Sequence, residues 1–292
     1  MPDGRFAPSP TGRLHLGNLR TALVAWLFAR SSGARFLVRM EDLDPAVARE
    51  EHEAQQLADL AAIGLDWDGD VVRQSERRSI HDAAIDQLVA AGLTYPCWCT
   101  RREILDAPTA PHAPPGAYPG TCRDREPPYP DRAPALRLRA GDVPVVVEDR
   151  LCGRFEGIVD DFVLRRGDGT PAYNLAVVVD DGAQGIGEVV RGDDLLPSTP
   201  RQVHLARTLG IDVPQYAHVP MVLGPDGARL AKRHGAVTLE DAGAPAEVLA
   251  RLAGSLGLAA SGEHVTPSSL LARFDPALLP RTPWVVGTLG RS

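Results

Sequence analysis

The sequence predicts an α/β fold in which a parallel sheet is interrupted by an insertion, and three observations support this. Residues 4–41 follow the order strand, loop, helix, strand, which is the repeating unit of a parallel α/β sheet. Residues 106–134 are rich in proline, which excludes long regular elements there. Helical spacing returns in residues 198–211. We therefore predict a Rossmann-type sheet split by an α+β insertion and followed by a short helical C-terminus.

The first helix has the clearest pattern in the N-terminal part. It follows a loop rich in Pro, Gly and Ser at 8–12 and ends near Gly33. Its apolar residues at helical spacing are Leu19, Leu23, Trp26 and Leu27. The run RFLVRME at 35–41 is typical of a strand. Further helical patterns cover about 46–63 and 76–91.

After the proline-rich region the pattern changes twice. Alternation in residues 135–157 predicts antiparallel strands, and the apolar run at 170–181 predicts a buried strand. Residues 198–211 predict a helix for which Gly210 is a suitable C-terminal cap. Residues 244–259 and 269–279 predict two short amphipathic helices.

Length and composition narrow the class of protein. The 292 residues carry a net charge of −7, which argues against a generally basic nucleic-acid-binding surface but allows a local basic groove. No apolar run reaches the roughly 18 residues that a membrane span needs, and the N-terminus lacks a signal-peptide pattern. We expect a cytoplasmic protein without membrane association. In that compartment cysteines stay reduced, so metal binding is favoured over disulfides.

The segment FAPSPTGRLHLGN, residues 6–18, places a rigid turn before the first helix. The amides and dipole at a helix N-terminus favour anions, and His15 could donate a hydrogen bond to a phosphate. Gly17 would let a flat ring approach the backbone. A phosphate or nucleotide is the ligand that this pattern favours. The alternative is structural, because Pro and Gly form loops and a histidine before a helix often caps or packs.

Lys232, in RLAKRHG at 229–235, is the only lysine among 31 basic residues. A lysine ammonium is a compact point charge on a flexible stem, whereas arginine is a planar fork. The chain could keep one lysine where only the point charge fits. The alternative is chance in an arginine-rich composition.

These segments resemble the glutamyl and glutaminyl branch of class I aminoacyl-tRNA synthetases. RFAPSPTGRLHLGN resembles the first signature of that branch, with LHLGN at the HIGH position, and GARLAKR lies where the class has KMSKS. The resemblance implies ATP-dependent adenylate formation, in which Lys232 would stabilise charge on the leaving pyrophosphate. Relative to the usual K-L-S-K-R, Arg229 replaces the first lysine and Ala231 replaces the serine.

The same resemblance implies the substrate-binding residues. The set for L-glutamate comprises Arg5, Phe6, Ala7, Pro8, Ser9, Glu41, Tyr173 and Arg191. The set for ATP comprises His15, Gly17, Asn18, Arg229 and Lys232, and of these His15 and Lys232 would be catalytic. Arginines could hold the two carboxylates of glutamate and Glu41 its ammonium, although which arginine meets which carboxylate stays open. The alternatives are that Glu41 is a solvated strand end and that Tyr173 is a core tyrosine.

The cysteines predict one structural zinc ion. Cys97 and Cys99 are one residue apart and Cys122 returns after the proline-rich loop, so three thiolates could hold tetrahedral zinc. The usual fourth ligand would be a histidine, and His112 is near in sequence. The resemblance to a subgroup of the branch instead implies Tyr118 as the fourth ligand. The alternative is three reduced thiols packed in a loop. Cys152, with no partner nearby, is expected to be a small buried residue.

Length refines the resemblance. The KMSKS-like loop ends at Arg233, and the remaining residues would cap the catalytic body without forming an anticodon-binding domain. This combination resembles the glutamyl-queuosine tRNA(Asp) synthetases. That family activates glutamate with ATP, accompanied by magnesium, without needing tRNA. It then transfers glutamate to queuosine at the wobble position of the tRNA(Asp) anticodon. The alternatives are a compact glutamyl-tRNA synthetase, a non-catalytic RNA-binding relative and a small nucleotidyltransferase.

The resemblance also implies how the chain is divided. Residues 1–96 and 186–238 would form the two halves of the catalytic domain, the second carrying the KMSKS-like loop. Residues 97–185 would form an inserted subdomain that binds zinc and faces nucleic acid, and residues 239–292 a short helical segment. Five arginines of the insertion could meet phosphates, although each alone is expected on the solvated surface: Arg137, Arg139, Arg150, Arg165 and Arg166. We expect a monomer.

Overall fold

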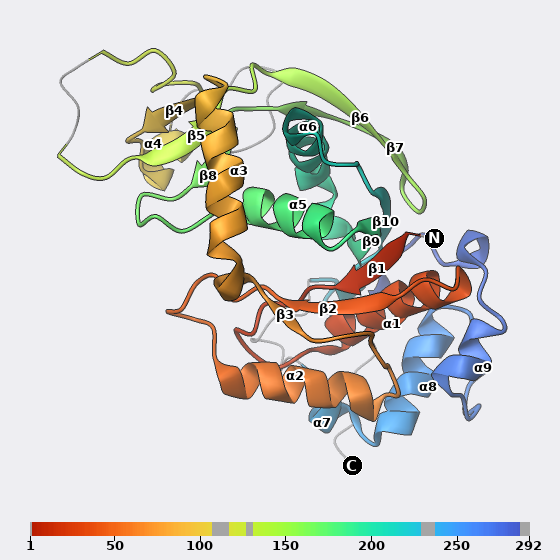
Figure 1. Cartoon of the computed structure of the whole chain (residues 1–292). Helices are drawn as coiled ribbons and strands as arrows, with labels where there is room; N and C mark the ends of the chain where they lie inside the picture. Colours follow the sequence, from red (N-terminus) through yellow and green to blue (C-terminus); the bar gives the residue numbers. More distant parts are fainter. Residues whose placement is uncertain (1, 107–116, 127–130, 229–236, 287–292) are drawn as a thin grey trace.

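The computed structural model describes residues 2–106, 117–126, 131–228 and 237–286. Its largest sheet has the strand order β3-β2-β1-β9-β10-β6-β7 (Figure 1). The strands are β1 (Asp3–Phe6), β2 (Phe36–Met40), β3 (Val72–Arg73), β6 (Val143–Asp149), β7 (Gly153–Val159), β9 (Ile186–Gly192) and β10 (Gln215–Val219). Every pairing in this sheet is parallel except that of β6 with β7. The predicted parallel α/β architecture is therefore confirmed.

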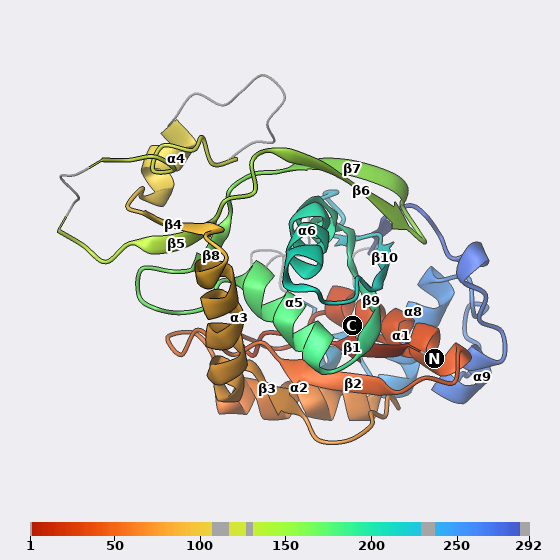
Figure 2. The same ribbon diagram turned by 45° about the horizontal axis from the view of Figure 1, so that its top comes forward.

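Helices cover both faces of the sheet (Figures 1 and 2). One face carries α1 (Leu16–Ser31), α8 (Pro245–Ser255) and α9 (Pro267–Leu271). The other carries α3 (Arg78–Ala90), α5 (Tyr173–Ala183) and α6 (Thr199–Leu209). The remaining helices are α2 (Glu50–Ala62), α4 (Arg101–Asp106) and α7 (Leu239–Ala242). None of the described helices is both long enough and apolar enough to cross a membrane.

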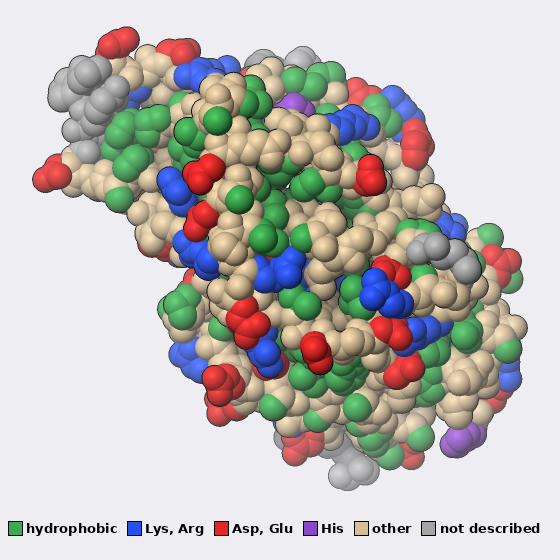
Figure 3. Space-filling view, in the orientation of Figure 1, with side chains coloured by type: hydrophobic (Ala, Val, Ile, Leu, Met, Phe, Trp, Pro, Cys, Tyr) green, Lys and Arg blue, Asp and Glu red, His purple; other side chains and the backbone are tan. Residues whose placement is uncertain are grey.

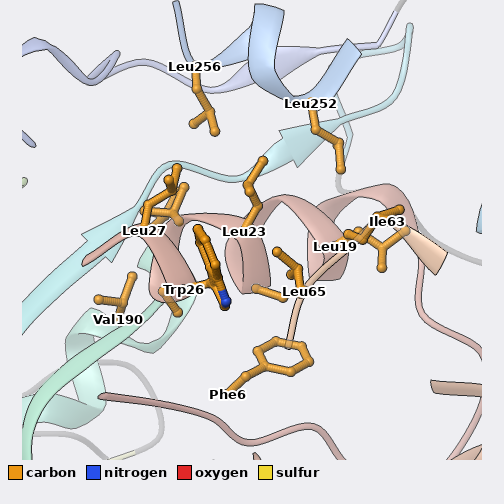
Figure 4. Close-up of a cluster of buried hydrophobic side chains, with 14 of the residues drawn as sticks. Phe6, Leu19, Leu23, Trp26, Leu27, Ile63, Leu65, Val190, Leu252 and Leu256 are labelled. Atoms are coloured by element: carbon orange, nitrogen blue, oxygen red, sulfur yellow. The ribbon is translucent and has the colours of Figure 1, made fainter. Parts of the chain in front are cut away.

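The larger core cluster forms around α1. Its side chains interdigitate with those of β1, β9 and α8, and Figure 4 shows Leu23, Trp26 and Leu252 among them. Nearly all of α1 is buried, because the sheet covers one side of it and the C-terminal helices cover another. The helices α8 and α9 thus complete the core around α1.

Two small sheets lie outside the main one. The first consists of β4 (Thr94–Cys97), β5 (Ala135–Leu138) and β8 (Val163–Arg165), which pair antiparallel and carry the cysteine cluster at one end. The second pairs β11 (Val222–Leu223) with β12 (Trp284–Val285). The hairpin of β6 and β7 joins the main sheet through β10. Residues 97–185 therefore contribute to both the small antiparallel sheet and the large sheet.

Most predicted elements are confirmed. The first helix, the strand after it and the helices near 46–63 and 76–91 are present as α1, β2, α2 and α3, with shorter bounds. The helix at 198–211 is α6, and Gly210 caps it in the left-handed conformation, with φ of 71°. The C-terminal helices are α8 and α9.

The strand predicted at 170–181 and the burial expected of Cys152 are wrong. The apolar run at 170–181 is the helix α5 and not a strand. This helix packs between α3, α6 and the sheet, and its residues from Leu175 to Asp181 are all buried. A helix buried on all sides lacks the polar face that reveals its period, so a short apolar run is ambiguous. Cys152 is exposed, because it lies in the turn between β6 and β7.

Candidate active site

A cavity of about 590 Å³ opens at the carboxyl ends of β1, β2 and β9. Parallel α/β sheets bind ligands at this edge. Eleven of the thirteen residues predicted to bind glutamate or ATP line the cavity: Arg5, Phe6, Ala7, Pro8, Ser9, His15, Gly17, Asn18, Glu41, Tyr173 and Arg191. The other two, Arg229 and Lys232, lie outside the described residues. The structure therefore brings together predicted residues that are up to 186 positions apart in sequence, from Arg5 to Arg191.

His15 is the N-cap of α1. Its Nδ1 accepts hydrogen bonds from the backbone N–H groups of Gly17 (3.1 Å) and Asn18 (3.3 Å), and its own N–H donates to Asn18 Oδ1 at 3.1 Å. The N–H of Leu16 donates to Val237 O at 3.0 Å. The amides of Leu16, Gly17 and Asn18, in the first turn of α1, are thus already bonded. An Nδ1 that accepts leaves the proton of a neutral ring on Nε2.

This geometry revises how the helix start could hold an anion. The amides of Gly17 and Asn18 donate to the imidazole, and the imidazole can in turn donate through Nε2. The capping interpretation and the phosphate interpretation of His15 are therefore compatible, because they use different nitrogens. A Cβ at position 17 would lie 2.9 Å from His15 Cε1 and 3.0 Å from its Nδ1. Gly17 thus provides space for this ring.

Arg5, on β1, is held by an acidic partner from α5. Its Nε and Nη2 donate to the two carboxylate oxygens of Asp181, at 3.2 and 3.4 Å, and its Nη1 donates to Val190 O at 3.4 Å. Arg39, on β2, lies 2.8 Å from the same carboxylate and is fully buried. Burial opposes charge on Asp181, but the two guanidinium groups outweigh it and keep the pKa of Asp181 low.

Glu41 follows β2 at the cavity wall. Its carboxylate lies 3.7 Å from Arg39 Nη2, and its backbone N–H donates to Pro8 O at 2.9 Å. Burial raises the pKa of Glu41, although the nearby Arg39 and Arg5 oppose the shift. Glu41 is therefore not a solvated strand end, and its carboxylate faces a region with two arginines.

Arg191, near the end of β9, is 5% exposed and contacts three side chains. Its Nη1 donates to Tyr173 Oη at 3.3 Å, its Nη2 to Thr199 Oγ1 at 2.9 Å and its Nε to His218 Nε2 at 3.1 Å. Tyr173 is 39% exposed and lines the cavity, so it is not a core tyrosine. Arg191 is thus fixed from behind while its Tyr173 side borders the cavity.

Several residues of this site were not predicted. Asp181, Thr199 and His218 hold the predicted arginines, and Arg39 shares the Asp181 carboxylate with Arg5. Gln56 donates to the carbonyl oxygens of Ser9 and Gly12 in the N-terminal loop. One sequence signal existed: Arg39 and His218 are polar residues within apolar strand runs. A buried polar side chain must find a partner, so such residues indicate a network.

The cysteine cluster lies apart from the cavity. The Sγ atoms of Cys97, Cys99 and Cys122 all lie within 4.8 Å of one another. Tyr118 Oη is 3.3 Å from Cys97 Sγ and 3.7 Å from Cys99 Sγ, and Cys99 Sγ is 3.6 Å from Cys122 Sγ. Ligands of tetrahedral zinc lie about 3.5–3.8 Å apart, given Zn–S near 2.3 Å and Zn–O near 2.1 Å. The cluster could therefore hold zinc.

Tyr118 and Cys122 differ in how readily they ionise. Burial and the Cys97 thiol raise the pKa of Tyr118, so its phenol needs a metal to ionise. Burial raises the pKa of Cys122 too, but hydrogen bonds, first from the Trp98 backbone and then from Tyr118, lower it to about 7. Arg137, expected on the surface, is 5% exposed and stacks on Tyr118 at 3.6 Å. His112 lies outside the described residues.

Charge is mixed on one face of the molecule. On the face drawn in Figure 3, Lys and Arg side chains are interspersed with Asp and Glu. The described part of this face therefore presents no continuous basic surface. The cavity lining is likewise mixed, with Arg5, Arg13 and Arg191 beside Glu41 and Asp194.

The fold and this cavity define a class I aminoacyl-tRNA synthetase. The family described as tRNA synthetases class I (E and Q), catalytic domain, matches residues 3–269, and the chain belongs to this family. A crystal structure of a glutamate tRNA ligase from Elizabethkingia meningosepticum, in complex with its amino acid, has the same fold. It has a TM-score of 0.83 at 28% identity, and the match covers 98% of this chain and 67% of that one.

Within this family, the chain belongs with the glutamyl-Q tRNA(Asp) synthetases. It is 63% identical to the glutamyl-Q tRNA(Asp) synthetase of Nocardia farcinica, over 97% of this chain and 92% of that relative. It is 44% identical to the glutamate–tRNA ligase of Dichelobacter nodosus, over 81% of this chain and 52% of that relative.

Proposed function

We propose that this protein activates L-glutamate with ATP, without requiring tRNA, and transfers the glutamyl group to queuosine at the wobble position of tRNA(Asp). In the first step a glutamate carboxylate oxygen attacks the α-phosphorus of ATP and pyrophosphate leaves. In the second step a hydroxyl oxygen of the nucleoside attacks the acyl carbon, loses its proton, and AMP leaves. The enzyme is an ATP-dependent ligase of the class I type.

One observation carries this proposal: the cavity joins two buried arginines and a carboxylate to a histidine-capped helix start. Arg5 and Arg191 suit the two carboxylates of glutamate, and Glu41 suits its ammonium. The loop of Phe6, Ala7, Pro8 and Ser9 forms the adjoining wall of this pocket. A site of this kind selects a small amino acid with an acidic side chain, because binding must satisfy every buried charge.

The ATP phosphates would lie at the start of α1. His15 would donate to them through Nε2, with Gly17 and Asn18 forming the adjoining wall, and a magnesium ion would accompany ATP. Lys232 and Arg229 would approach from the KMSKS-like loop, where Lys232 neutralises the leaving pyrophosphate. No protein nucleophile is needed, because positioning and charge stabilisation supply the rate.

The first test is ATP–pyrophosphate exchange with purified protein, offering glutamate, glutamine or aspartate in separate reactions without tRNA. We expect exchange with glutamate alone. Exchange that requires tRNA would contradict the proposal and favour charging of a tRNA 3′ end. No exchange under either condition would leave a non-catalytic RNA-binding protein.

The acceptor is tested with labelled glutamate and two preparations of tRNA(Asp), one with queuosine and one with guanosine at the wobble position. We expect label to enter only the queuosine-containing tRNA. Label on both preparations, removed by blocking the 3′-terminal ribose, would show that the acceptor is the 3′ end.

We also propose that Cys97, Cys99, Tyr118 and Cys122 bind one structural zinc ion. The distances within the cluster support this assignment, and Arg137 would hold the Tyr118 ring in place. Metal analysis of protein prepared without chelator should find close to one equivalent of zinc. Its absence from reduced, folded protein would remove the proposal.

The remaining assignments are proposals of the same kind. We divide the chain into catalytic halves at 1–96 and 186–238, an inserted subdomain at 97–185 and a helical segment at 239–292. The strands β6 and β7, which lie within 97–185, join the catalytic sheet. We place the protein in the cytoplasm, where its tRNA substrate is found, and as a monomer, since one chain forms the whole cavity described here.

A further inference from the structure

Three buried polar residues lie side by side on adjacent strands behind the cavity. Asp149 is on β6, His218 on β10 and Arg191 on β9, and these strands are neighbours in the sheet. His218 and Arg191 are register partners. His218 is fully buried, and Asp149 and Arg191 are 6% and 5% exposed. Only Arg191 of the three lines the cavity.

The hydrogen bonds among them have only one consistent direction. A guanidinium N–H can only donate, so His218 Nε2 must accept from Arg191 Nε at 3.1 Å. The proton of a neutral imidazole then lies on Nδ1, which donates to Asp149 Oδ2 at 2.5 Å. Asp149 can only accept when ionised. The carboxylate therefore selects one tautomer of His218, and that tautomer presents a lone pair to Arg191.

Each member is held on its other side as well. Asp149 Oδ1 accepts from the backbone N–H groups of Leu151 (2.9 Å), Cys152 (2.8 Å) and His218 (3.1 Å). The Nη2 of Arg191 donates to Thr199 Oγ1 at 2.9 Å. The Nε and Nη2 side of the guanidinium is thus bound within the protein, and the side with Nη1 lies towards Tyr173 and the cavity.

We propose that Asp149 and His218 are positioning residues that orient Arg191 for a carboxylate of the substrate amino acid. The inference rests on the proposed role of Arg191 in glutamate binding. Neither residue would touch substrate: Asp149 fixes the tautomer of His218, and His218 fixes the plane of the guanidinium. A bidentate contact with a carboxylate requires that plane, because the two N–H donors must meet two oxygens.

The decisive variant is Asp149→Asn. Its amide oxygen can still accept from the backbone, but its NH₂ group replaces the oxygen that faces His218 Nδ1. That NH₂ group can only donate, so the imidazole proton must move to Nε2, where it faces the Arg191 Nε–H and has, among the described residues, only Thr199 Oγ1, 3.2 Å away, as an acceptor. His218 Nε2, which accepts from Arg191 in the wild type, thereby becomes a donor that faces another donor, with almost no change in side-chain shape.

We expect Asp149→Asn to raise KM for glutamate about 10- to 100-fold, the loss typical of a mispaired hydrogen bond to a charged group. The KM for ATP should stay within about twofold, because the variant leaves the start of α1 untouched. A purely structural role would lower the amount of folded enzyme without separating the two constants. Equal KM values for glutamate in variant and wild type would overturn the proposal.

A matched control is available in a second buried pair. His81 is fully buried and its Nε2 lies 3.1 Å from Asp180 Oδ1, but neither residue lines the cavity. His81→Gln should reduce stability while leaving KM for glutamate unchanged. A rise in KM equal to that of Asp149→Asn would mean that general loosening, and not the tautomer, causes the effect.

Arg191→Lys separates this inference from the proposed function. If this variant leaves KM for glutamate unchanged, the assignment of Arg191 to glutamate fails, and the positioning role fails with it. If KM rises for Arg191→Lys but not for Asp149→Asn, only the positioning role is wrong.

A spectroscopic readout tests the tautomer directly. With ¹⁵N-labelled histidine, the His218 signals should show a protonated Nδ1 in the wild type and a protonated Nε2 in Asp149→Asn. Assignment comes from the signal lost in His218→Gln. A wild-type ring protonated on Nε2 would contradict the proposal, whatever the kinetics show.

Discussion

The two nitrogens of His15 allow its structural and chemical roles to be separated by one substitution. Nδ1 caps α1 by accepting from Gly17 N and Asn18 N, whereas Nε2 is the proposed donor to phosphate. Asparagine is among the best N-cap residues, and its side-chain oxygen can accept the same two bonds. It is too short to place a donor where Nε2 lies. His15→Asn therefore keeps the cap and removes the donor, while His15→Ala removes both.

The expected magnitudes differ enough to be measured. Loss of an N-cap costs about 0.5–2 kcal/mol, which for a chain of this size lowers Tm by about 1–4 °C. We expect that loss for His15→Ala and almost none for His15→Asn. Loss of a donor to a transition-state charge lowers kcat by about 10²- to 10³-fold. Both variants should show it.

The assay is ATP–pyrophosphate exchange with glutamate, paired with thermal unfolding of the same preparations. A His15→Asn protein that exchanges at the wild-type rate would show that His15 only caps the helix. If His15→Asn is as unstable as His15→Ala, the capping argument is wrong. The exchange rate thus tests the donor role of His15, and the stability of the variants tests its role as a cap.

Two further predictions concern neighbours of this site. Gly17→Ala should lower kcat on the order of 10- to 100-fold with little change in Tm. The cause is that the new Cβ would displace the His15 ring by a few tenths of an ångström or more. An unchanged kcat would mean that the ring can move without loss of activity. Burial raises the pKa of Glu41, so its charge, and with it affinity for the glutamate ammonium, should be lost as pH falls through a value above the ordinary range of a glutamate. Measurement of KM for glutamate against pH should show this loss of affinity at acid pH. Arg39→Met should move the loss to higher pH, because it removes a positive charge 3.7 Å from the Glu41 carboxylate. If the pH of the loss stays the same in Arg39→Met, Arg39 is not the group that opposes the shift.

Much of the site could be predicted because its residues lie in short contiguous segments. The loop before α1 and the residues after β2 each carry several predicted site residues close together in sequence. The helix and the strand beside them have clear apolar patterns in the sequence. The cysteine cluster was predictable from the spacing of Cys97 and Cys99. In these cases the local sequence indicates both the type of element and which residues lie at its end.

The missed residues depend on contacts between distant segments. Asp149 and His218 were missed as neighbours of the predicted Arg191, because the three come from separate parts of the chain and only the order β9-β10-β6 brings them together. That order was not predictable, because the β6–β7 hairpin was assigned to an insertion and not to the main sheet. The helix α5 was missed for a related reason: burial on all sides removed the period that identifies a surface helix.

The strand order also explains why one cavity can hold two unlike substrates. The chain passes from β1 through α1 to β2 on one side, and from β9 through α6 to β10 on the other. Right-handed crossovers in opposite directions place α1 and α6 on opposite faces, so the connections diverge above β1 and β9. The start of α1, with His15, follows β1, whereas Arg191 lies at the end of β9, and β1 pairs directly with β9. The helix start that we propose for the ATP phosphates and the arginine that we propose for a carboxylate therefore meet across one pair of strands. The pairing of β1 with β9 thus sets the distance between the start of α1 and Arg191.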